Sequence, residues 1–329
     1  MNFKEGRWNH EINVTDFVKT NITPYEGDAS FLAGPTERTK AVWNKCLEAL
    51  AEERANNGVR SLDPSTVSTI TSFAAGYIDK DNEVIVGLQT DEVLRRAIKP
   101  FGGIKVVEKA CRENGVEVDP KVKDIFTHYR KTHNDGVFDA YTEEIRSFRS
   151  LGFLTGLPDN YARGRIIGDY RRLALYGIDR LIEAKQDDLR HLTGPMTDER
   201  IRLREEVAEQ IKALKEIKVM GQQYGLDLSR PATTAQEAVQ WVYMAYLAAV
   251  KEQDGAAMSL GNVSSFLDIY IEYDMAHGNL DELHAQELID QFVIKLRMVR
   301  HLRMQAYTDI FAGDPTWVTE SIGGRFNDG

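Results

Sequence analysis

The stretch from Gln236 to Gly261 reads QEAVQWVYMAYLAAVKEQDGAAMSLG. Its most apolar part, Val239–Val250, is 12 residues long and contains a single glutamine. A membrane-spanning helix needs about 20 consecutive apolar residues, so this run predicts a buried helix of a globular protein. Thr234 and Glu237 have the spacing of a capping box, which predicts the helix start. Because the run is apolar nearly all round, we expect it to lie deep in the core.

Helical periodicity dominates on both sides of this stretch. One helix is predicted to end at Asn56-Asn57-Gly58, and Asp119 with Pro120 predicts the start of another. Strand signals are few: EVIVGL at 83–88 is one candidate, and 266–271 fits either a helix or a strand. We therefore expect a helix-rich α/β chain with a minority of strands. Three further helices are predicted over about Arg200–Met220, over about Glu282–Arg303, and from about Ile166 into the 180s.

The composition excludes several classes of protein. The chain has 329 residues, enough for one large domain or two ordinary ones, and a formal net charge of −10. That charge argues against general affinity for nucleic acid or anionic membranes, although a local basic pocket for a small anion remains compatible with it. The N-terminal residues lack the apolar region of a secretory signal. Two cysteines in a chain of this length favour a reducing compartment, so we expect a cytoplasmic protein.

The sequence contains few of the common catalytic and metal-binding motifs. The sequence has no Walker A loop, no GxGxxG and no HExxH, and no metal is predicted. AMSLG at 257–261 resembles a nucleophile elbow without its first glycine, but a helix rather than a strand is predicted before it. Cys46 and Cys111 fall on apolar helical faces, which favours inert core residues over nucleophiles. His128 and His133 are spaced too poorly to share one metal and are predicted at the surface.

One segment raises a functional question by its pattern alone. Thr155–Arg172 reads TGLPDNYARGRIIGDYRR, in which Arg163 and Arg165 flank Gly164 just before a predicted helix. Guanidinium groups beside a flexible backbone and a helix start suit a carboxylate or a phosphate. The pattern alone favours the alternative, an arginine paired with a core carboxylate such as Asp169. The pattern leaves both interpretations open.

The same segment resembles pyruvate formate-lyase, a glycyl-radical enzyme family, and the resemblance extends over nearly the whole chain. Further matching strings begin at Thr23, Ile85, Ile125, Gln236 and Phe311: TPYEGDASFLAGPTE, IVGLQTDEVLRRAIKPFGGIK, IFTHYRKTHNDGVFDAYT, QEAVQWVYMAYLAAVKEQDGAAMSLG and FAGDPTWVTESIGG. Long strings in the same order are far more specific than any short motif.

The resemblance implies a fold and a reaction. The fold would be the N-terminal part of a ten-stranded α/β barrel, with residues 1–329 forming one partial-barrel region. The reaction would convert pyruvate and coenzyme A to acetyl-coenzyme A and formate in anaerobic glucose metabolism. It would use a glycyl radical and a pair of adjacent cysteines, with no metal. The implied partners are a radical S-adenosylmethionine activating enzyme and a second copy in a homodimer.

The resemblance also assigns roles to residues of this sequence. Arg165 matches the arginine that binds the pyruvate carboxylate, whose plane a two-point guanidinium contact would fix. Small and aromatic lining residues of the pyruvate pocket, and more weakly a residue of the coenzyme A site, match the following positions: Ala256, Ala257, Phe311, Trp317 and, for coenzyme A, Phe138. Each of these could alternatively serve packing alone.

The sequence departs from the family in one respect. It has no adjacent cysteine pair, and it ends before the glycyl-radical loop. The turn-like end at 326–329 predicts a truncated chain, with a frayed natural terminus as the alternative. Because the cysteine pair and the radical loop are missing, we expect the chain to be inactive alone. Two alternatives remain open: a 2-ketobutyrate formate-lyase, differing in room around the substrate methyl group, and a non-catalytic protein that binds a partner or an anion.

Overall fold

The structure is a computed structural model of the whole chain. It describes seven stretches of the sequence, and all structural statements below concern these: residues 1–98, 104–129, 141–154, 168–252, 258–300, 302–310 and 318–322.

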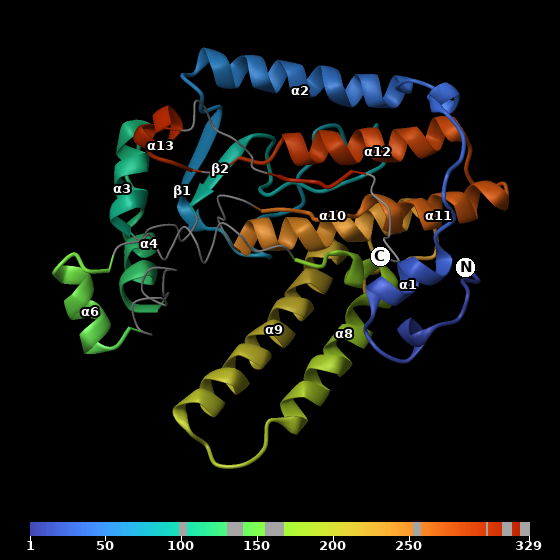
Figure 1. Cartoon of the computed structure of the whole chain (residues 1–329). Coiled ribbons are helices and arrows are strands. Elements are labelled where there is room, and N and C mark those ends of the chain that lie inside the picture. The colour runs from blue at the N-terminus through green and yellow to red at the C-terminus, as the bar shows by residue number, and fades with distance from the viewer. Residues whose placement is uncertain are drawn as a thin grey trace.

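Helices make up most of the described chain, as predicted (Figure 1). The described strands are two, and short helical turns accompany the longer helices. The elements are η1 (Arg7–Asn9), α1 (Val14–Asn21), η2 (Ala29–Phe31), α2 (Glu37–Ala55), β1 (Ser61–Val67), β2 (Arg95–Ile98), α3 (Ile104–Glu113), α4 (Pro120–Asp124), the π-helical turn η3 (Ile125–Tyr129), α6 (Glu143–Ser150), α8 (Arg171–His191), α9 (Asp198–Gln223), α10 (Ala235–Glu252), α11 (Ser264–Ala276), α12 (Glu282–Arg297) and α13 (Gln305–Ile310).

β1 and β2 pair in parallel, with Ser61 opposite Arg95 and Val67 opposite Ile98. The register shifts between Asp63 and Val67, where β1 contains Pro64. Proline has no N–H to donate to a ladder, so an irregular position in a strand suits it. The two strands are joined by a long crossover, as parallel pairs require.

Helix α10 occupies the centre of the molecule and contacts α8, α9, α11 and α12 (Figure 1). Trp241, Tyr243 and Tyr246 on α10 are each at most 2% exposed. The predicted capping residue is present, since Thr234 Oγ1 accepts a hydrogen bond from Glu237 N at 3.1 Å. The prediction of a deeply buried helix here is confirmed.

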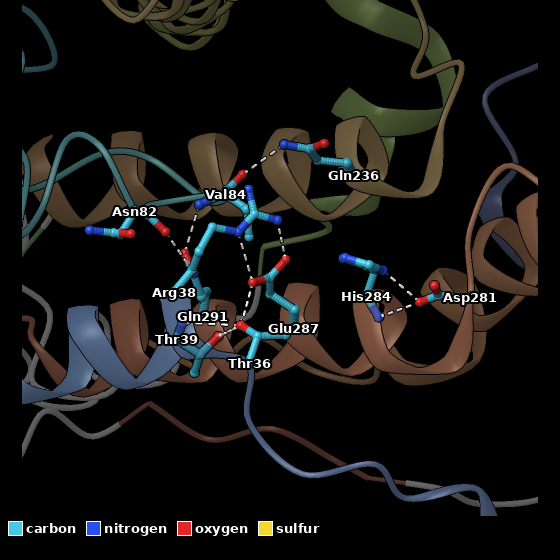
Figure 2. Close-up of polar contacts among 10 residues, drawn as sticks. All are labelled: Thr36, Arg38, Thr39, Asn82, Val84, Gln236, Asp281, His284, Glu287 and Gln291. Carbon is cyan, nitrogen blue, oxygen red and sulfur yellow. Dashed lines mark hydrogen bonds and ion pairs between the residues drawn. The ribbon is translucent and has the colours of Figure 1, made fainter.

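The predicted strand at 83–88 is wrong, because this segment is an extended chain between α10 and α12 without a strand neighbour. Glutamine side chains replace the missing ladder (Figure 2). Gln291 of α12 accepts from Val84 N at 2.7 Å and donates to Asn82 O at 3.0 Å. Gln240 of α10 accepts from Val86 N at 2.7 Å and donates to Val86 O at 2.9 Å.

Two predicted helices differ from the observed ones in their bounds. α12 ends at Arg297, whereas the sequence predicted about Arg303. The chain after α12 is hydrogen-bonded to a glutamine side chain instead of continuing the helix: Arg300 N donates to Gln89 Oε1 at 2.9 Å. α8 contains a break at Gly177, where φ is +70°. A side chain there would lie 2.4 Å from the backbone carbon of Arg230, so the close approach of α8 to this loop requires glycine.

The remaining helix predictions agree with the structure. α2 ends where Asn57 and Gly58 have positive φ, and Asp119 caps the helix that begins at Pro120. The ambiguous segment 266–271 lies within α11. α8 and α9 form a long hairpin that extends away from the other helices (Figure 1). Ile166, the predicted start of α8, is outside the described residues.

Candidate functional site

All six predicted site residues fall outside the described residues: Arg165, Ala256, Ala257, Phe311, Trp317 and Phe138. We call the described residues that directly precede or follow these segments the border residues. Their positions can be compared with one another. Five of the six lie in 155–167, 253–257 and 311–317, after which the described chain resumes at Gly168, Met258 and Val318.

The border residues after 253–257 lie beside the border residues after 311–317. Gly261 and Glu320 form an isolated parallel bridge. Leu260 N donates to Thr319 O at 2.8 Å, and Ser321 N donates to Gly261 O at 2.8 Å. The described residues that follow 253–257 are thus hydrogen-bonded to those that follow 311–317, although about 60 positions separate them.

The border residues after 155–167 contact the same place through Arg171, the first residue of α8. Arg171 Nη1 donates to Asn262 O at 3.3 Å, and its Nε donates to Asp169 Oδ1 at 2.8 Å. Asp169 also pairs with Arg172 at 3.4 Å. The core carboxylate that the sequence offered as an alternative partner for Arg165 is therefore engaged by two neighbouring arginines.

The place where Arg171, Asn262 and the chain at 318–322 come together is called the meeting point below. Glu320 is its acidic residue. Its Oε1 accepts a hydrogen bond from Val263 N at 3.0 Å. Burial raises the pKa of the Glu320 carboxyl, while backbone N–H groups of Val263 and Ser264 and the charge of Arg171 act in the opposite direction. The carboxylate thereby fixes the start of α11 beside the chain at 318–322.

Buried tyrosines pack behind the same border. Tyr170 and Tyr246 are in edge-to-face contact, with ring centroids 5.6 Å apart. Burial raises the pKa of both hydroxyls, so both are neutral at physiological pH. The Tyr246 hydroxyl is buried and has no hydrogen-bond partner among the described residues. Such a group is rare in a protein interior.

The carboxyl end of β1 reaches the remaining side of this region. Ser68, which follows β1, donates from Oγ to Lys251 O at 2.7 Å, and Ile70 N donates to Glu252 Oε1 at 3.1 Å. Lys251 and Glu252 are the last described residues before 253–257. In parallel sheets, ligands bind beyond the carboxyl ends of the strands, and this is the end that faces the border residues.

Neither cysteine belongs to this region as a reactive group. Burial raises the pKa of the Cys46 thiol to about 12 and that of the Cys111 thiol to about 11. Both side chains are fully buried, so the prediction that they are core residues is confirmed. His128 is exposed and bonded to Asp124, as predicted for a surface residue, and His133 lies outside the described chain.

Over the described part of the chain, no group of three His, Cys, Asp or Glu side chains is arranged to hold a metal ion. No helix among the described residues has the length and apolar character needed to cross a membrane.

Comparison with known proteins identifies the family. The pyruvate formate lyase-like family matches residues 7–329. The chain belongs to this family. It is 56% identical over 332 residues to a formate acetyltransferase of Haemophilus influenzae, with 99% of this chain and 43% of that protein covered. The chain thus spans less than half the length of this relative.

Solved structures agree on the fold. A B12-independent glycerol dehydratase from Clostridium butyricum, in its glycerol-bound form, gives a TM-score of 0.59 at 18% identity. A Roseburia inulinivorans protein described for 1,2-propanediol dehydration gives 0.60 at 17% identity. Each comparison covers 91% of this chain and 44% of the other. The pyruvate formate lyase-like chain therefore has the predicted fold class, a helix-rich part of the glycyl-radical enzyme barrel.

Sequence reasoning did not single out three residues of this meeting point: Arg171, Glu320 and Tyr246. All three occur within strings that carried the resemblance: TGLPDNYARGRIIGDYRR, FAGDPTWVTESIGG and QEAVQWVYMAYLAAVKEQDGAAMSLG. The proximity of Arg171 and Glu320 had no local signal, because about 150 residues separate them in the chain.

Proposed function

We propose that the protein to which this chain belongs converts pyruvate and coenzyme A to acetyl-coenzyme A and formate. The observation that carries the proposal is the 56% identity to a formate acetyltransferase, maintained over 99% of this chain. The reaction would use a glycyl radical and an adjacent cysteine pair, whereas the two cysteines of this sequence, Cys46 and Cys111, are not adjacent. A radical S-adenosylmethionine activating enzyme would install the radical, and the protein would act as a cytoplasmic homodimer.

Within that enzyme, this chain would supply part of the substrate pocket. Arg165 would bind the pyruvate carboxylate, and in a chain with a net charge of −10 a local cation is needed to hold an anionic substrate. Ala256 and Ala257 would leave room for the substrate, with Phe311 and Trp317 as apolar lining. Phe138 would contact coenzyme A. The joined borders of three of these segments support the assignment, because they bring distant parts of the chain to one place.

The chain alone should be inactive. Cys46 and Cys111 are buried thiols with raised pKa values, so neither can replace the nucleophilic pair. We expect no exchange between formate and pyruvate when the 329-residue chain is treated anaerobically with activating enzyme and S-adenosylmethionine. Turnover above background would contradict this part of the proposal.

The test of the pocket uses Arg165→Lys in a protein of full family length that carries this chain. Lysine keeps the charge but loses the planar two-point contact. Losing a charge-assisted contact of about 1.5–3 kcal/mol should lower kcat/KM for pyruvate roughly 10- to 100-fold. The glycyl radical, quantified by electron paramagnetic resonance, should be unchanged.

The matched control is Arg202→Lys, an exposed arginine on α9. It should leave both the kinetics and the radical at the parental level. Unaltered pyruvate kinetics in Arg165→Lys would remove this residue from the pocket.

A further inference from the structure

An arginine-rich cavity lies at the opposite end of β1 from the border residues. It has a volume of about 610 Å³ and is lined by the end of α2, β2, the end of α3 and the chain that follows α12. This volume is within the range of small-molecule sites. Asn57, Gly58 and Val59, which precede β1, form one wall. β1 has seven residues, so about 20 Å of strand separates this wall from Ser68.

The floor of the cavity is a buried ionic cluster. Arg300, 3% exposed, donates from Nε to Glu53 Oε1 at 2.8 Å and from Nη2 to Glu53 Oε2 at 3.0 Å. Arg96, 4% exposed, donates from Nη2 to Glu53 Oε1 at 3.3 Å and to Gly58 O at 2.7 Å. Two buried guanidinium groups therefore share one buried carboxylate.

The rim adds further positive charge. Arg297 and Arg303 line the opening, and Glu113 is the second acidic residue of the lining. Glu113 already accepts a hydrogen bond from Gln305 N at 2.8 Å and lies 3.9 Å from Lys109. Among the lining residues, four arginines face two glutamates, an excess of two positive charges in a chain with a net charge of −10.

Arg297 is the group that a ligand could engage without rearrangement. Its side chain is exposed, and its guanidinium has no hydrogen bond or ion pair with any residue that the structure describes. The guanidinium fork matches the oxygens of a phosphate in two-point contact. In the floor, the two positive charges of Arg96 and Arg300 exceed the single negative charge of Glu53, which also favours an anion nearby.

We propose that this cavity binds a small phosphate-bearing anion, at a site separate from the proposed substrate pocket. Arg297 would make the direct contact at the rim, and Arg300 and Arg96 would supply the positive potential of the floor. The ligand could be free phosphate or a phosphate ester, which share the dianionic group.

Isothermal titration calorimetry of the 329-residue chain, in low-salt buffer free of phosphate, tests the site. Inorganic phosphate should bind saturably at one site, with a Kd of about 1 mM or tighter, and added salt should weaken it. Glycerol phosphate is the second probe. Tighter binding of the ester would identify an ester as the ligand, and equal binding would identify the phosphate group alone. Tighter binding of succinate than of either probe would overturn the assignment to phosphate.

Arg297→Gln should weaken phosphate binding about 10-fold or more, the loss expected for a charge-assisted contact. Arg297→Lys should restore part of it. Arg202→Gln on α9 removes a charge that is also exposed but lies elsewhere, and it should have no effect. The proposal is overturned if the parent chain does not bind phosphate, or if Arg202→Gln weakens binding as much as Arg297→Gln. Absence of the site in a protein of full family length would also overturn it, and this outcome does not depend on pyruvate turnover.

Discussion

The segment at 82–89 and the α8–α9 hairpin satisfy their polar groups in opposite ways. The segment is enclosed between α10 and α12, and its backbone is bonded by side chains more than 100 positions away, including Gln240 and Gln291. The hairpin has regular helical hydrogen bonds, and several of its ion pairs join residues three apart in the sequence, such as Lys185 and Asp188. Much of the hairpin's outer surface is exposed.

The difference shows where polar side chains matter for stability. In the hairpin, water can replace a lost partner, so an ion pair contributes little. Around 82–89 the bonded groups are buried or partly buried, so a lost partner is replaced less readily by water and the loss costs more. Glu83 and Lys295 illustrate this, with an ion pair at 2.8 Å and side chains at most 1% exposed. Equivalent substitutions should therefore differ greatly in effect between the two regions.

The largest effect is expected for Lys295→Met. Removing the cation leaves the Glu83 carboxylate buried without its counter-charge, which should lower the free energy of unfolding by about 3–5 kcal/mol. Urea denaturation followed by circular dichroism would measure it. The double variant Glu83→Gln with Lys295→Met should regain part of the loss, because the uncompensated charge is gone. A change below about 1 kcal/mol for Lys295→Met would contradict the expectation that the buried ion pair matters more than exposed ones.

A smaller loss is expected for Gln240→Leu. The leucine leaves both the N–H and the C=O of Val86 without their side-chain partner, at a cost of about 1–3 kcal/mol for two partly buried groups. The matched control is Gln222→Leu, at an exposed position of α9. It should stay within about 0.5 kcal/mol of the parent. Equal effects of the two leucines in urea denaturation would show that the glutamine contacts are not needed.

Glu237 lies where the hairpin meets α10, and an intermediate effect is expected there. Its carboxylate pairs with Arg230, which lowers its pKa from 4.5 to about 2. The stabilisation is fully present above the ordinary pKa and is lost as pH falls through the lowered one. Because both side chains are partly exposed, we expect about 1–2 kcal/mol.

Urea denaturation of the parent and of Glu237→Gln at a series of pH values tests this contribution. The parent should be the more stable protein above the ordinary pKa of the carboxyl, and the two should converge as pH falls toward about 2. A stability difference that stays constant over this range would mean that the carboxylate charge is not its source.

The smallest effect is expected for Lys218→Gln in the hairpin. Lys218 pairs with Asp179 at 2.6 Å, but the two side chains are 34% and 58% exposed. An exposed pair of this kind contributes about 0–1 kcal/mol, and salt should reduce it further. Thermal denaturation of the parent and of Lys218→Gln at low and high salt would measure this contribution. A loss of stability as large as that of Lys295→Met would contradict the difference between the two regions.

From the sequence alone, most of the long helices and the burial of both cysteines could be predicted. The apolar run at 239–250 could only be a core helix, and capping residues such as Thr234 and Asp119 marked the starts of helices correctly. These signals are local, because a helix is formed by contacts between residues three and four positions apart. The family and its fold class were likewise evident from long matching strings.

The conformation of the extended segments could not be predicted from the sequence, because it depends on tertiary contacts. EVIVGL has the composition of a strand, yet it lies between two helices whose glutamines bond its backbone, and the last predicted turn of α12 is likewise replaced by a pairing with Gln89. The meeting of Arg171, Asn262 and Glu320 joins residues about 60 to 150 positions apart. Such contacts depend on which buried backbone groups need a partner after the core has formed, and no local pattern records that requirement.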